Sequence, residues 1–197
     1  MDLPENRSNG MVAQQELSGA RGAVAVFCGS QPGILPEFEI DARSVGQLLA
    51  ENHFELIYGG GNTGLMGAVA AGCLESGGSV TGVIPRILVT RECAHQGLTQ
   101  IHVVENMHIR KQMMYQLSDA FIILPGGNGT LDELFESITW NTLDIHRKKI
   151  MLLNTAHYYD ALLEHFERMK AAGFLYNTAP FTVCQSPEEL IPLLTIN

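Results

Sequence analysis

The stretch from Ala120 to Glu133 constrains the fold of this chain more than any other. Residues 120–124 are all apolar, as in a strand buried on both faces, and the apolar positions 131, 134, 135 and 138 have helical spacing. Between them lies the glycine-rich sequence Pro125-Gly126-Gly127-Asn128-Gly129. Such a strand-to-helix turn lets a ligand approach the main chain, and the free N–H groups of a helix start suit an anion such as phosphate. The adjacent carboxylates of Asp132 and Glu133 indicate chemistry on the group attached to that phosphate.

The rest of the chain repeats this alternation of strand and helix. The pattern predicts strands at 23–28, 56–58, 80–84, 101–104, 120–124, 150–153 and 181–184, and helices at 36–52, 65–75, 107–117, from 131, 158–171 and from 187. It predicts an α/β fold, a Rossmann-like, doubly wound, mostly parallel sheet of about seven strands with helices on both faces. Ligands of such sheets bind outside the carboxyl ends of the strands, where both glycine clusters of this chain fall.

Length and charge limit the kind of protein. The 197 residues predict a single catalytic domain over 23–197, preceded by a polar stretch, 1–22, that we expect to be a mobile N-terminal tail. A hydrophobic content of 46% is enough for a buried core. The net charge of −9 argues against nucleic-acid binding, which needs clustered Lys and Arg, but leaves room for a small anionic ligand.

The cysteines and the apolar runs indicate a cytoplasmic protein. Four scattered cysteines form no CxxC pair, which fits a reducing compartment. The polar start does not resemble a secretory signal, and no apolar run is long enough to cross a bilayer, so we expect no membrane association. Cys93 and His95 lie close together, but two ligands do not make a zinc site, and no metal is predicted.

An earlier glycine cluster follows the strand predicted at 56–58. The sequence Gly59-Gly60-Gly61-Asn62-Thr63-Gly64 satisfies G-x-G-x-x-G between a strand and a helix, as in dinucleotide sites. The acid that should bind the ribose about 20 residues later is missing, and Arg86 stands in that region, which weakens NAD and leaves NADP open. Tight packing of strand on helix without a ligand is the other interpretation.

The second cluster also has a structural interpretation. Thr130-x-x-Glu133 fits a capping box, in which Glu133 would bond back to the Thr130 amide. The field of the helix start should then keep Glu133 ionised at neutral pH, so that it acts as a base or an anionic stabiliser and hardly as a proton donor. A third feature is the basic pair Arg110-Lys111 at the start of a helix, where Arg110 is able to make a forked contact with phosphate or ribose oxygens.

Three segments together resemble the LONELY GUY family of cytokinin riboside 5′-monophosphate phosphoribohydrolases, proteins often labelled lysine decarboxylase because of the same glycine motif. They are 59–67 (GGGNTGLMG), 107–111 (MHIRK) and 125–133 (PGGNGTLDE). The resemblance covers roughly residues 23 to 175. It implies a Rossmann-like fold, a homodimer or an assembly of dimers with the active site near the dimer contact, and hydrolysis of a nucleoside 5′-monophosphate to free base and ribose 5-phosphate. It implies no metal and no organic cofactor.

The resemblance also implies site residues. The catalytic Arg and Glu of the family fall on Arg110 and Glu133. The substrate contacts fall on Glu92, Lys111, Gly127, Asn128, Gly129, Thr130, Leu131, Asp132 and Thr139. From the residues themselves we expect the amides of 126–130, beginning with Gly126, to bind the 5′-phosphate, with Gly60 and Gly61 nearby. The sequence leaves open whether the base is a cytokinin or adenine.

Two other functions fit parts of the pattern. A non-catalytic nucleotide or cofactor carrier of the same fold is the first, since fold alone does not separate binding from turnover; the pairing of Arg110 with Glu133 favours catalysis. An NADP-dependent oxidoreductase using Gly59 to Gly64 is the second, and the missing ribose-binding acid counts against it. A lysine decarboxylase would need pyridoxal phosphate, for which the sequence offers no convincing lysine.

Overall fold

A computed structural model describes residues 20–89, 95–175 and 180–194 of the chain. The strands are β1 (Gly22–Phe27), β2 (Phe54–Tyr58), β3 (Val80–Pro85), β4 (Gln100–Val104), β5 (Ala120–Ile123), β6 (Lys149–Leu153) and β7 (Thr182–Cys184). The helices are α1 (Pro36–Glu51), α2 (Gly64–Glu75), α3 (Met107–Leu117), α4 (Asn128–Thr142), α5 (Asp160–Ala171) and α6 (Leu190–Leu193), with short 3-10 turns η1 (Arg86–Leu88), η2 (Thr155–His157) and η3 (Pro187–Glu189).

The strands form one seven-stranded sheet in the order β4-β3-β2-β1-β5-β6-β7, and every neighbouring pair is parallel. The predicted α/β fold with a parallel sheet is therefore confirmed. Successive strands are added outward from β1 to β4 on one side, and from β5 to β7 on the other. The direction in which strands are added to the sheet reverses between β1 and β5. This switch point is where sheets of this kind bind ligands.

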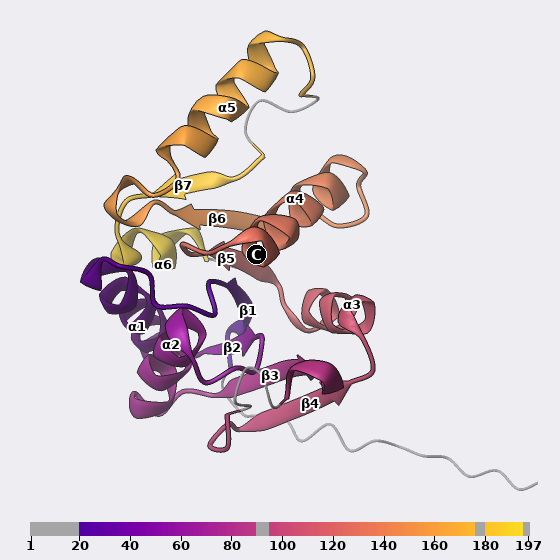
Figure 1. Ribbon diagram of the computed structural model, residues 1–197. Coiled ribbons are helices and arrows are strands. Elements are labelled where there is room, and N and C mark those ends of the chain that lie inside the picture. The colour runs from indigo at the N-terminus through magenta and orange to yellow at the C-terminus, as the bar shows by residue number, and fades with distance from the viewer. Residues whose placement is uncertain (1–19, 90–94, 176–179, 195–197) are drawn as a thin grey trace, which may run out of the picture.

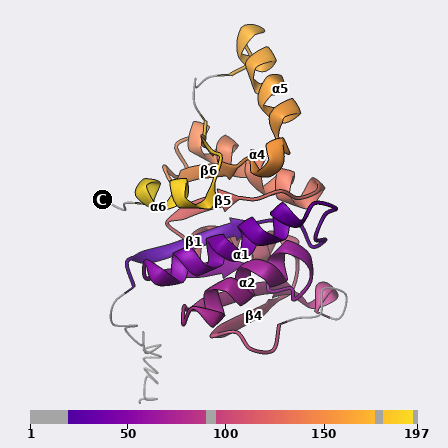
Figure 2. The ribbon, with the colours of Figure 1, turned by 90° about the vertical axis from the view of Figure 1, so that its left-hand side faces the viewer.

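Helices cover both faces of the sheet (Figures 1 and 2). One apolar core lies between the sheet and helices α1, α2 and α6, and a second lies between the sheet and helices α3, α4 and α5. Alternate residues of β1 pack into the two cores: Val24 and Val26 lie in the first, and Ala25 and Phe27 lie in the second. A strand covered on both faces has to be apolar throughout, which explains the unbroken apolar runs of the sequence.

The expected elements agree with the structure except at some ends. The largest difference is α4, which begins at Asn128 and not at Leu131, so Asn128 and Gly129 of the glycine-rich stretch lie inside the helix. Residues 155–157 form η2, and α5 starts only at Asp160. The tail expected over 1–22 lies mostly outside the described residues and stays a prediction. Within the described ranges, no helix is both long and apolar enough to span a bilayer.

Candidate active site

A cavity of about 250 Å³ opens at the switch point, beside the ends of β1 and β5. Four parts of the chain that are distant in sequence meet there: the loop after β1, the starts of α2 and α4, and the first turn of α3. Its lining residues are Cys28, Gly29, Ser30, Met66, Met107, Arg110, Gly127, Asn128, Gly129, Thr130, Asp132 and Glu133. The lining mixes a glycine-rich main chain, one cation and two acids, which suits a small anionic ligand.

The start of α4 supplies main-chain donors to this cavity. The first intrahelical bond runs from the Leu131 N–H to the Gly127 carbonyl (3.1 Å), so the amides before Leu131 have no partner within the helix. A Cβ built at Gly127 or Gly129 would meet nothing within 4 Å. The chain therefore leaves open space beside unpaired N–H groups, as an anion site requires.

The capping-box interpretation of Thr130 and Glu133 is wrong. Gly127 is the N-cap of α4, and no side chain makes a capping hydrogen bond there. Thr130 lies inside the first turn, buried to 3% exposure and packed against Gly126. Glu133 is therefore free of the helix start and takes part in the cavity.

Arg110 is a buried cation that faces the cavity from α3. Its side chain is 7% exposed. Nη2 donates to the Gly59 carbonyl (3.3 Å), Nη1 lies 3.8 Å from the Met107 sulfur, and the buried Nε has no partner. Among the described residues Arg110 forms no ion pair. Burying a guanidinium without a carboxylate partner is unfavourable, so the arrangement indicates an anion supplied from outside the chain.

Glu133 faces the same cavity from α4 and is 8% exposed. Burial raises the pKa of its carboxyl from 4.5 to about 7, although the nearby Arg110 guanidinium acts to lower it. The expectation that the helix start keeps Glu133 fully ionised at neutral pH is therefore wrong. Glu133 lies beyond the first turn, where the helix dipole is weak and loss of water dominates. A carboxyl with this pKa exchanges its proton readily near neutral pH.

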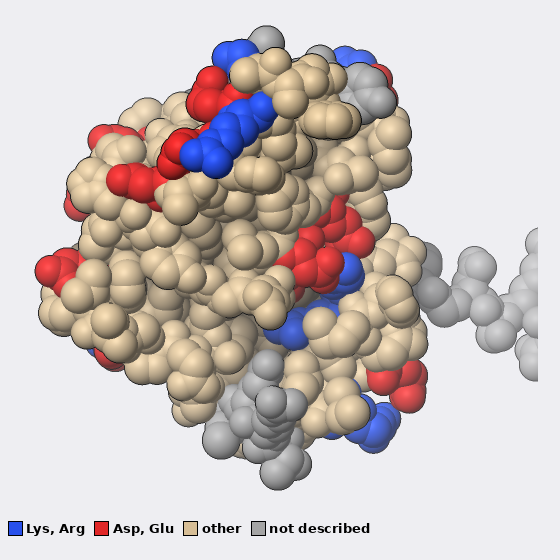
Figure 3. Space-filling model, turned by 45° about the horizontal axis from the view of Figure 1, so that its top comes forward, with Lys and Arg blue, Asp and Glu red and all other residues tan. Residues whose placement is uncertain are grey.

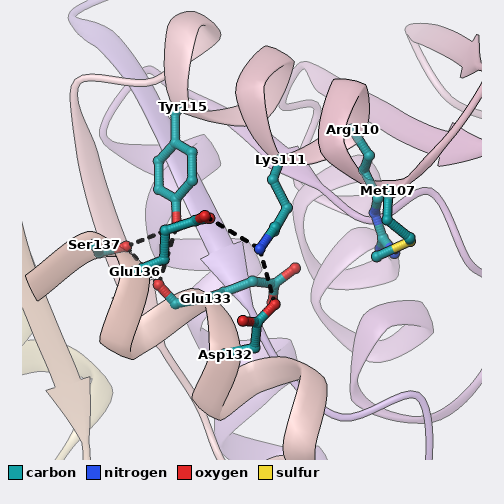
Figure 4. Close-up of polar contacts among 8 residues, drawn as sticks. All are labelled: Met107, Arg110, Lys111, Tyr115, Asp132, Glu133, Glu136 and Ser137. Carbon is teal, nitrogen blue, oxygen red and sulfur yellow. Dashed lines mark hydrogen bonds and ion pairs between the residues drawn. The ribbon is translucent and has the colours of Figure 1, made fainter. Parts of the chain in front are cut away.

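Lys111 joins α3 to α4 beside the cavity. Acidic and basic side chains lie side by side near the middle of the face drawn in Figure 3. Lys111 Nζ lies 3.0 Å from Asp132 Oδ2 and 3.2 Å from Glu136 Oε1. Figure 4 shows this ammonium between the two carboxylates, with the Glu133 side chain extending from α4 in the direction of Arg110. Burial acts to lower the pKa of Lys111, but the two carboxylates outweigh it and raise that pKa.

The structure brings most of the predicted site residues together. Arg110, Gly127, Asn128, Gly129, Thr130, Asp132 and Glu133 line the one cavity. Gly126 lines an adjoining cavity of about 280 Å³, which shares Gly29, Ser30 and Gly127 with the first and is mostly apolar. Lys111 adjoins the site through its ion pairs. Each of these assignments as a ligand contact stays a prediction.

Other predicted residues lie elsewhere. Gly60 and Gly61 are buried, and Leu131 and Thr139 lie further along α4; none of the four lines either cavity. Thr139 is exposed and donates to the Phe135 carbonyl (2.7 Å). Glu92 falls outside the described residues. Sequence analysis missed five lining residues: Cys28, Gly29, Ser30, Met66 and Met107. The signal for the first three was their place at the carboxyl end of the first strand.

Metal ligands and reactive thiols each need a particular arrangement of residues. No group of three or more His, Cys, Asp or Glu residues there is arranged to hold a metal ion. Cys28 lies at the cavity, but burial and the neighbouring Glu133 raise the pKa of its thiol, which keeps it protonated and a poor nucleophile.

These features define a Rossmann-like α/β protein with a cavity at its switch point whose lining suits an anion. Residues 66–194 match the family model described as "Possible lysine decarboxylase". The chain is 46% identical to the cytokinin riboside 5′-monophosphate phosphoribohydrolase of Rhodococcoides fascians over 154 residues, 78% of each chain. It is 42% identical to the Arabidopsis thaliana enzyme of that name, LOG7, over 164 residues, which are 83% of this chain and 76% of the relative. This chain belongs to the cytokinin riboside 5′-monophosphate phosphoribohydrolase (LONELY GUY) family.

The fold also occurs in solved structures. The molybdenum cofactor binding protein of Rippkaea orientalis superimposes with a TM-score of 0.66 over 90% of this chain and 97% of that one. Its sequence identity of 22% shows a shared fold alone.

Proposed function

We propose that this protein hydrolyses the N-glycosidic bond of a nucleoside 5′-monophosphate, a cytokinin riboside monophosphate or AMP, to the free base and ribose 5-phosphate. The relatives named for this reaction supply the substrate class. The observation that supports it best concerns the lining of one cavity. The buried Arg110 guanidinium, which forms no ion pair among the described residues, and the buried Glu133 carboxyl both line it, beside a helix start with free amides. A carrier needs the anion site but gains nothing from a carboxyl that titrates near neutral pH.

Binding is expected to use charge at both sides of the nucleotide. The free N–H groups at the start of α4 donate to the oxygens of the 5′-phosphate, with the positive end of the helix dipole behind them. Arg110 lies across the cavity and holds the ribose phosphate through its fork of donors. Filling the cavity in this way supplies the anion that the buried guanidinium lacks.

The chemistry is expected to centre on Glu133. As the bond between C1′ and the base nitrogen breaks, positive charge develops on the ribose, and an ionised carboxylate nearby stabilises it. The same carboxylate takes a proton from the attacking water, whose oxygen forms the new bond to C1′. The base leaves with the electron pair of the broken bond and takes up a proton. Because the pKa of Glu133 is about 7, the carboxyl that has just gained a proton is able to give it up again.

The remaining expectations follow from the family. We expect a homodimer or an assembly of dimers with the cavity near the contact between subunits, no metal or organic cofactor, and a cytoplasmic protein. Thr139 is exposed on α4 and lies outside the cavity of the single chain, and we expect it to contact a partner subunit or a ligand in the assembled protein.

The test is base release from AMP and from isopentenyladenosine monophosphate, followed by chromatography. We expect the Glu133→Gln variant to bind nucleotide and to lose base release by roughly 10²- to 10⁴-fold, the range of a lost acid–base catalyst. Arg110→Ala should weaken binding and also slow release. The control is Glu51→Gln, the same change at an exposed position of α1. Binding without release by the wild-type protein would instead support the carrier, and full turnover by Glu133→Gln would remove the carboxylate from the mechanism.

A further inference from the structure

The Arg110 guanidinium is held by a residue from the first glycine cluster. Nη2 of Arg110 donates to the carbonyl of Gly59, 51 positions earlier in the chain, and the contact is buried. It is the one hydrogen bond to oxygen or nitrogen that the described residues provide to this guanidinium, since Nη1 contacts the sulfur of Met107 and Nε is unpaired. The direction of the guanidinium therefore depends on one main-chain carbonyl.

Gly59 also provides the space that the guanidinium occupies. A Cβ built at position 59 would lie 2.1 Å from Arg110 Nη2, 3.3 Å from Arg110 Cζ and 2.9 Å from the sulfur of Met66. A separation of 2.1 Å between heavy atoms that are not bonded is not tolerated. Met66 is flexible and able to move, but the collision with Nη2 is relieved only if Arg110 leaves its place.

The neighbouring glycines do not offer a competing role at the ligand. Gly60 and Gly61 are buried and line neither cavity, and Gly60 has a φ of 77°, a conformation that favours glycine. This turn fixes the chain directly after Gly59. The contact of the first cluster with the site is therefore the one that Gly59 makes with Arg110.

We propose that Gly59 is a positioning residue of the hydrolysis, which sets the Arg110 guanidinium through its carbonyl and through the absence of a side chain. The inference rests on the role proposed for Arg110 in the reaction. It replaces the dinucleotide-site interpretation of the first cluster with a structural role, because Gly59 contacts an arginine of the protein and not a phosphate.

The first test is the Gly59→Ala variant. We expect kcat/KM for base release to fall by roughly a hundredfold, the effect of displacing a catalytic group by about 1 Å. The matched control is Gly78→Ala, whose Cβ would lie 2.5 Å from Cys73 Sγ and 2.6 Å from Ala50 Cβ in the core under α1 and α2. It should lower the thermal midpoint and leave the activity of the folded protein unchanged.

The decisive test is whether Gly59 acts through Arg110. In an Arg110→Ala background the Gly59→Ala change should cost no further activity, since residues acting as one unit give non-additive losses. Added guanidinium chloride should partly restore Arg110→Ala. It should fail to restore the double variant, because the methyl group takes the place of Nη2.

The outcomes separate the inference from the proposed function. An inactive Arg110→Ala beside a fully active Gly59→Ala overturns the positioning role alone. The same follows if the two losses of activity multiply in the double variant, or if guanidinium restores Arg110→Ala and the double variant equally. A fully active Arg110→Ala overturns the role of the arginine in the proposed reaction, and the positioning role with it.

Discussion

At the scale of single residues, the burial of Glu133 links stability to pH. Its pKa of about 7 in the folded protein lies above the unfolded value of 4.5, so the folded state binds the proton more tightly. The contribution to stability is complete below pH 4.5 and is lost as the pH rises through 7. A shift of this size corresponds to about 3 kcal/mol at pH 8. We therefore expect Glu133→Gln, which has no charge to bury, to raise the free energy of unfolding at pH 8 by up to about that amount.

Denaturant unfolding of both proteins at pH 5 and pH 8 measures this effect. The gain from the Glu133→Gln change should be small at pH 5, where wild-type Glu133 is protonated, and large at pH 8. The exposed carboxylate at Glu51 provides the control, since Glu51→Gln should give no such rise. Equal stabilities of wild type and Glu133→Gln at pH 8 would show that Glu133 does not bear its charge in a buried site.

At the scale of secondary-structure elements, Lys111 connects α3, which positions Arg110, to α4, which positions Glu133. The charged or titratable groups around Glu133 are Arg110, Lys111 and Tyr115 on α3, Asp132 and Glu136 on α4, and Cys28 after β1. Lys111 lowers the pKa of Glu133, and Glu136 raises it. We expect Lys111→Met to move the acidic limb of the kcat/KM profile to higher pH, and Glu136→Gln to move it to lower pH.

The opposite directions make this prediction specific to electrostatics. Loosening the contact between α3 and α4 would move both profiles in the same way or change only the maximal rate. Lys111→Arg keeps the charge and should leave the limb in place. The phosphate of the substrate also titrates near pH 6, but it is the same in every assay and cancels in the comparison. Coincident limbs for all three variants and the wild type would contradict a coupling of Lys111 to Glu133.

The elements also show how far the sequence determines the site. Periodicity located each strand and helix, because the apolar pattern and the burial on both faces have the same cause. The start of α4 differs from the prediction, because glycines at 127 and 129 favour a loop although the helix admits Asn128 and Gly129 in its first turn. The pKa of Glu133 and the contact of Gly59 with Arg110 depend on packing between segments distant in sequence, which no local pattern contains.

At the scale of the whole molecule, the helices that carry the site also expose apolar side chains. On α3 these are Met107, Ile109 and Leu117, 41%, 38% and 39% exposed, and on α4 Phe135 is 37% exposed. Ile109 and Leu117 lie about 80° apart around α3, and we expect a homodimer formed through this side of α3 to cover them and to enclose the cavity, as the assembly expected of the family would. A stable interface of standard size buries about 1,200–2,000 Å² in total, which needs more than a single helix.

The assembly is tested at Leu117, two turns of α3 away from Arg110. We expect Leu117→Glu to sediment as a monomer and to lose most base release, because a buried charge at the contact is unfavourable and the cavity loses its enclosing partner. The control is Ile40→Glu, a charge at an exposed isoleucine (63%) of α1 on the opposite face of the sheet. It should keep both the dimer and the activity. A wild-type protein that is monomeric and fully active at assay concentration would contradict the role of the partner, and a Leu117→Glu dimer would place the contact on another face.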